Sequence, residues 1–139
     1  MWVGALWSVG LIVAPTLFQF VPDRMLAGSI AGRLFTYTAL LGVVCGAYLS
    51  LFRLARFGSH AWRQPFFWVV LIMLVLVVVG QFGVQPILDS VRQQAFPKQV
   101  MESVLRDRFA AWHGIASVLY VVECVLGLGL VLLQARVPN

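Results

Sequence analysis

The sequence predicts an all-α, polytopic membrane protein: an antiparallel bundle of four transmembrane helices, with a short amphipathic segment between helices three and four. Three observations support this fold. Of the 139 residues, 61% are hydrophobic and only 11% are charged, whereas an ordinary soluble domain has roughly 25% charged residues. Four runs are almost free of charge and close to the ~20 residues that cross a hydrocarbon core. None of them shows the polar face, repeating every ~3.6 residues, of a helix in a soluble bundle.

The four runs define the expected spans, which together form one domain over residues 1–139. Helices are expected because lipid offers no partner to unpaired backbone N–H and C=O groups. The first run has no basic leading region and no small-x-small cleavage site, so we interpret it as a span and not as a signal peptide. The expected spans cover residues of about 2–21, 31–54, 65–89 and 108–135.

The connection between spans three and four has its own pattern. In PKQVMESVLRDRF, Pro97 occupies a helix-starting position and is followed by apolar residues at helical spacings. We expect an amphipathic helix that lies at the membrane interface or extends span four outward.

The basic residues indicate the expected partner and orientation. The net charge is +5, and the basic residues lie at span ends, where they anchor helices against lipid headgroups. The lipid bilayer, and not nucleic acid, is therefore the expected partner. The loop RLARFGSHAWR is short and free of acids, as cytoplasmic loops tend to be. We expect this loop and both termini to be cytoplasmic.

Polar residues collect at one end of every span. Span one carries Gln19 near its far end, and span four opens with His113. Because successive spans run in opposite directions, these ends lie at one membrane face, together with the corresponding ends of spans two and three. We predict a polar or ligand-binding cluster there, with one deeper member in span four. Its members are His113, Gln81, Gln85, Arg33, Gln19 and Glu123.

Glycines and prolines in the spans favour an alternative, purely structural role. Small residues four apart let neighbouring helices approach closely, and proline removes a backbone hydrogen bond and kinks a helix. Interhelical hydrogen bonds and close glycine contacts would then hold the bundle together without any ligand. The predicted helix-packing residues are Gly28, Gly32, Gly42, Gly46, Pro15 and Pro86.

Span four carries two titratable side chains inside its apolar run. His113 lies about 6 Å along the helix from Phe109, near the interface, at ~1.5 Å per residue. Glu123 lies about 21 Å along, where a carboxylate costs roughly 2.5–3.5 kcal/mol to insert. No Lys or Arg lies at this depth, so we expect Glu123 to be protonated or hydrogen-bonded. The candidate donors are Tyr37, Tyr48, Ser8 and Thr38.

Four stretches, in order along the chain, resemble the bacterial members of the transmembrane protein 205-like family, which are small four-helix integral membrane proteins. They are APTLF, AGSIAGRLF, QFGVQPIL and RFAAWHGIASVLY. The resemblance implies a four-helix membrane protein of the bacterial inner membrane and implies no activity. Nine positions of this sequence match the family motifs, and Glu123 is not one of them. Those positions are Ala14, Pro15, Phe18, Gly28, Gly32, Phe35, Gln81, Pro86 and His113.

Three functional hypotheses remain open. The first is binding or handling of a small solute or metal ion in the polar cluster, with His113 as a candidate metal ligand and copper as a candidate metal. The second is a haem-binding redox protein, although His60 lies in a loop at the opposite face and cannot be a second axial ligand in the same chain. The third is an accessory or scaffold subunit, or a homo-oligomer, that contacts membrane proteins through glycine-rich faces. The sequence holds no hydrolytic triad or phosphate loop, which favours a non-enzymatic role.

Overall fold

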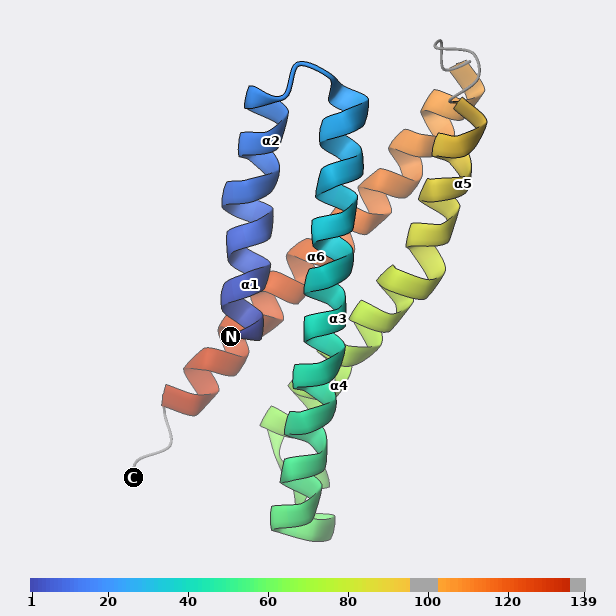
Figure 1. The fold of residues 1–139 in the computed structure, drawn as a ribbon. Coiled ribbons are helices and arrows are strands. Elements are labelled where there is room, and N and C mark those ends of the chain that lie inside the picture. The colour runs from blue at the N-terminus through green and yellow to red at the C-terminus, as the bar shows by residue number, and fades with distance from the viewer. Residues whose placement is uncertain (96–102, 136–139) are drawn as a thin grey trace.

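The computed structural model describes residues 1–95 and 103–135, and every secondary-structure element in these ranges is a helix (Figure 1). Four helical stretches are long and apolar enough, by length and composition, to cross a membrane. The predicted class, an all-α protein with four such spans, is confirmed. The stretches are Trp2–Phe20, Leu26–Arg63, Pro65–Val91 and Arg106–Ala135.

The first span consists of three helical segments in a row: α1 (Trp2–Ser8), the π-helix η1 (Val9–Val13) and α2 (Ala14–Phe20). The π-helical segment comes immediately before Pro15. Proline has no N–H to donate, so the α-helical ladder is interrupted at this point. The hydroxyl of Thr16 donates to the carbonyl oxygen of Ile12 at 2.6 Å.

The second span is the long helix α3 (Arg24–Phe57), which extends beyond the expected range of 31–54 at both ends. At its start, Asp23 Oδ1 accepts a hydrogen bond from the backbone N–H of Leu26 at 3.3 Å, as an N-cap does. At its end, Gly58 has a φ of 53° and stops the helix, as glycine commonly does in this conformation. The short 3₁₀ helix η2 (Gly58–Arg63) then leads into the third span.

The third span consists of α4 (Pro65–Val78), the π-helix η3 (Val79–Val84) and α5 (Gln85–Ala95). The π-helical segment again lies just before a proline, Pro86. The helix start expected at Pro97 lies in residues 96–102, outside the described part of the chain. The fourth span is α6 (Ser103–Ala135); it begins outward of the expected residue 108.

Successive spans run in opposite directions, and α6 crosses the others obliquely (Figure 1). Helix α3 packs against α4, α4 packs against α6, and α1 contacts both α3 and α6. The contact between the first two spans is close, because the indole of Trp2 lies against two glycines of α3. A Cβ atom at Gly42 would lie 2.6 Å from Trp2 Nε1, and one at Gly46 would lie 3.3 Å from the ring.

Two groups of buried apolar side chains hold the spans together. The larger contains Trp2, Leu6, Met73 and Val77, and so joins the first span to the third. The second contains Phe66, Val70 and Leu130, nearer the end where η2 connects α3 to α4. Toward the opposite end, where α2 and α5 lie, the spans surround a cavity.

Candidate functional site

All four spans contribute to the wall of a cavity of about 390 Å³. The first span contributes η1 and α2 residues such as Gly10 and Ala14, and the second contributes the α3 face that carries Gly28 and Phe35. Most of the lining is apolar, with a few polar side chains from the second, third and fourth spans. The volume falls within the ~300–1,000 Å³ typical of small-molecule sites. The polar lining residues are Thr38, Gln81, Gln85, His113, Ser117, Tyr120 and Glu123.

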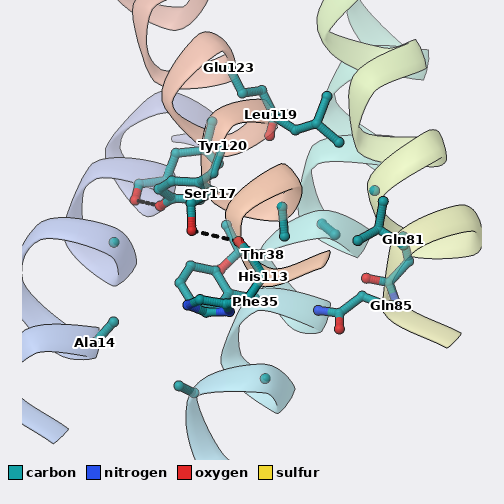
Figure 2. A pocket seen from close by; sticks show the side chains of 18 of the residues that line it. Ala14, Phe35, Thr38, Gln81, Gln85, His113, Ser117, Leu119, Tyr120 and Glu123 are labelled. Atoms are coloured by element: carbon teal, nitrogen blue, oxygen red, sulfur yellow. Dashed lines mark hydrogen bonds between the residues drawn. The ribbon is translucent and has the colours of Figure 1, made fainter. Parts of the chain in front are cut away.

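At one end of the cavity, two amides and an imidazole lie together. Gln81 in η3 and Gln85 at the start of α5 are four residues apart and so share one helix face. Both are half-buried, and Figure 2 shows their side chains directed toward the cavity. His113 on α6 is exposed, and its ring stacks on Phe109 with the ring centres 5.7 Å apart. This end therefore presents hydrogen-bonding groups from two different spans.

The three hydroxyl groups of the lining each donate a hydrogen bond to a backbone carbonyl oxygen. Thr38 donates to Leu34 at 2.9 Å, and Ser117 donates to His113 at 2.8 Å. Tyr120 donates to Leu6 of the first span. Since a hydroxyl group has one proton, none of the three has a second one to donate.

Glu123 is the only charged-type side chain of the described lining that is buried, with 7% of its surface exposed. Its Oε1 atom is buried and has no hydrogen-bond partner among the described residues. The expected donors do not satisfy this atom. Tyr37 and Tyr48 are 66% and 67% exposed, and the hydroxyl of Thr38 donates within its own helix. Of the two expected alternatives, a hydrogen bond is therefore not formed at Oε1, and a protonated carboxyl group stays a prediction.

The remaining predicted polar residues lie elsewhere. Arg33 lines a second hollow of about 300 Å³ beside the cavity, together with Gln85 and Asp89. Gln19 is exposed and lines neither hollow. The reason is helical geometry: Phe18 faces the cavity, and the next residue on a helix points about 100° away.

The predicted packing residues divide into three groups. Gly28 and Gly32 line the cavity, so the first small-residue step forms part of its wall. Gly42 and Gly46 lie under the indole of Trp2. The two prolines line neither hollow and follow the π-helical segments η1 and η3; they are Pro15 and Pro86.

Sequence reasoning missed the glycines of the two π-helical segments. Gly10 in η1 faces the ring of Tyr120, and a Cβ atom there would collide with the phenol. Gly80 in η3 lines the cavity, and a Cβ atom there would meet nothing within 4 Å. A signal was present, because Gly10 lies five residues before Pro15 and Gly80 lies six residues before Pro86, close to where an α-helix is expected to be interrupted.

A metal site is not assembled around His113. Within residues 1–95 and 103–135, no three His, Cys, Asp or Glu side chains are grouped so that they could hold a metal ion. His60 lies in η2, which joins α3 to α4, and does not line the cavity that His113 lines. The imidazole at the cavity is thus accompanied by amides and a distant carboxyl group.

The fold and cavity define a small helical protein whose four spans are apolar enough to cross a membrane and together line a largely apolar pocket. The chain belongs to the family described as a domain of unknown function, DUF4149, which residues 1–97 match. No curated protein and no solved structure matches the chain. The matched residues include Gln81 and Gln85, whereas the α6 wall of the cavity lies outside the match.

Proposed function

We propose that this protein is an integral membrane protein that binds a small, mainly apolar organic molecule in the cavity between its four spans. The observation that carries the proposal is the cavity itself, with an apolar lining and a few converging polar side chains. Ligand pockets typically have this composition, because apolar area supplies affinity and a few polar groups fix orientation. Gln81, Gln85 and His113 are the groups that would orient the ligand at one end.

An organic solute suits this lining better than a soft metal ion such as copper. The polar groups of the cavity are mostly amides and hydroxyls, with one imidazole and one carboxyl group. Soft metals such as copper favour thiolate and thioether ligands, and neither Cys nor Met lines the described cavity. The apolar area of the lining would instead be matched by a hydrocarbon or aromatic ligand.

The finer family relationship is also part of the proposal. We infer that the chain is a transmembrane protein 205-like four-helix bundle of the bacterial inner membrane, with both termini cytoplasmic. Most of the positions that carry this resemblance line one cavity, which supports a shared pocket and not merely a shared hydropathy pattern. They are Ala14, Phe18, Gly28, Gly32, Phe35, Gln81 and His113.

Two glycines of η3 offer a matched test of the pocket. Gly80 lines the cavity and has open space at its Cβ position, whereas Gly83 is exposed and does not line it. We expect 4-phenylbutan-1-ol to bind the protein saturably in phosphatidylcholine nanodiscs, as measured by isothermal titration calorimetry after subtraction of empty nanodiscs. Gly80→Leu should weaken this binding at least about tenfold, which corresponds to ~1.4 kcal/mol. Gly83→Leu should leave it unchanged.

Two outcomes would count against a ligand pocket. The first is a binding heat that shows no saturation once the heat measured with empty nanodiscs has been subtracted. The second is an equal effect of the two substitutions, because the probe would then be bound outside the cavity.

A further inference from the structure

Glu123 lies far from the amide end of the cavity. It follows His113 by ten residues on α6, which corresponds to about 15 Å along the helix. Figure 2 shows its side chain extending from α6 toward the other lining side chains. The two ends of the cavity therefore carry different groups: amides and an imidazole at one end, and a carboxyl group at the other.

None of the three hydroxyl groups in the described cavity wall donates to the carboxyl oxygen Oε1 of Glu123. Oε1 is buried without a hydrogen-bond partner within the described part of the chain. The hydroxyl protons of Thr38, Ser117 and Tyr120 are all committed to backbone carbonyls. A buried carboxyl group without a donor is costly, so a ligand that brings a donor would gain more here than at a solvated carboxylate.

The charge of the lining favours a cationic donor. Among the described residues, the cavity wall includes no Lys or Arg. Arg33 lines only the second hollow, beside Asp89. An anionic head group would therefore meet Glu123 with no fixed cation to offset the repulsion, whereas an ammonium group would neutralise it. Ionisable groups within spans characteristically act as counter-ions of this kind.

We propose that the ligand of the cavity is a lipophilic amine, with its apolar body against the apolar wall and its ammonium group paired with the carboxylate of Glu123. This inference rests on the proposed function, because it names the class of molecule that the same pocket takes. Glu123 is the binding residue, and it selects the charge of the head group.

Three probes with one apolar body and different head groups test the proposal: 4-phenylbutylamine, 4-phenylbutan-1-ol and 4-phenylbutanoate. Each is titrated at pH 7 into the protein and into Glu123→Gln, in nanodiscs of zwitterionic phosphatidylcholine so that lipid charge does not attract the amine. The amine should bind the unmodified protein at least tenfold more tightly than the alcohol, and the carboxylate should not saturate. In Glu123→Gln, the affinity for the amine should fall at least tenfold, and that for the alcohol less than twofold.

Several results would overturn the inference. One is equal affinity of the amine for the unmodified protein and for Glu123→Gln, and another is tighter binding of the carboxylate than of the amine. A third is an equal fall in the affinities for the amine and the alcohol in Glu123→Gln, which would indicate a neutral hydrogen bond. If Glu123→Gln does not fold, the order of the three probes on the unmodified protein still decides. If the alcohol binds saturably and the amine binds no more tightly, the amine proposal alone is refuted. If none of the three probes binds saturably, the pocket itself is refuted.

Discussion

The hydroxyl of Tyr120 on α6 donates a hydrogen bond to the carbonyl oxygen of Leu6 on α1, and so joins the fourth span to the first. The phenol reaches this carbonyl because Gly10, one turn further along the first span, has no side chain in its way. The ring of Phe35 on α3 packs edge-on against the same phenol, with the ring centres 5.2 Å apart. Three spans thus meet at Tyr120, which forms part of the cavity wall.

Removal of the Tyr120 hydroxyl should loosen this junction. Tyr120→Phe keeps the ring and loses the hydrogen bond. We expect the free energy of unfolding to fall by about 0.6 kcal/mol, the average for hydrogen bonds between membrane helices, and by no more than ~1.7 kcal/mol, the maximum. Thermal unfolding in mild detergent measures it as a lower Tm. Tyr48→Phe is the control, because Tyr48 is 67% exposed and its ring stacks on Phe52 of the same helix. An equal Tm for Tyr120→Phe and the unmodified protein would show that the hydrogen bond contributes nothing.

Gly10→Ala should destabilise the protein, although alanine is the better helix former. The added Cβ atom would collide with the ring of Tyr120, and forced overpacking typically costs about 1–3 kcal/mol. Gly4→Ala in α1 is the matched control, since a Cβ atom there meets nothing within 4 Å. It should be neutral or stabilising by up to ~1 kcal/mol. Equal unfolding temperatures for the two variants would contradict the close contact at Gly10.

Gly42→Ala should be destabilising only when Trp2 is present. The new Cβ atom would lie 2.6 Å from Trp2 Nε1, so the indole must shift. We expect a coupling free energy of about 0.5–3 kcal/mol in a double-mutant cycle with Trp2→Ala, measured by thermal or denaturant unfolding. Gly129→Ala in α6, where a Cβ atom meets nothing within 4 Å, supplies a control without coupling. If the changes in the free energy of unfolding caused by Gly42→Ala and Trp2→Ala are additive, the two residues do not restrict each other.

Gln81→Ala should affect ligand binding more than folding. The half-buried amide lines the cavity, and loss of one hydrogen bond to a ligand costs about 0.5–1.5 kcal/mol, or roughly two- to tenfold in affinity. Titration with 4-phenylbutan-1-ol measures this change. Gln19→Ala removes the same side chain from an exposed position outside the cavity and should leave affinity unaltered. A lower Tm for Gln81→Ala with unaltered affinity would favour a purely structural role for the amide.

The four spans could be predicted from the sequence because span length and hydropathy are local properties of the chain. Their ends could not be predicted as well, since α3 begins where Asp23 caps it and stops at Gly58, both outside the apolar run. The π-helical segments η1 and η3 also escaped prediction. The segment η1 is as apolar as the α-helices around it, and η3 holds Gln81 and two glycines within what is still one apolar span, so span hydropathy marks neither segment.

The candidate site could be predicted in part. The antiparallel order of the spans is sufficient to bring Gln81, Gln85 and His113 to the same end, and all three line the cavity. It does not fix the rotation of each helix about its axis, so the exposed position of Gln19 could not be foreseen. The unpartnered oxygen of Glu123 depends on where the hydroxyl protons of three other residues point, which only coordinates reveal.

Within the described cavity wall, every titratable side chain belongs to α6: His113, Tyr120 and Glu123. The other three spans supply amides, glycines, hydrocarbon and the hydroxyl of Thr38. The acid–base character of the described wall is therefore supplied by one helix, which also contributes apolar wall residues such as Leu119 and Val121. A chimaera that exchanged this helix alone would replace every titratable group of the described wall and keep the amides of Gln81 and Gln85, so charge preference and amide recognition are separable by a single helix exchange.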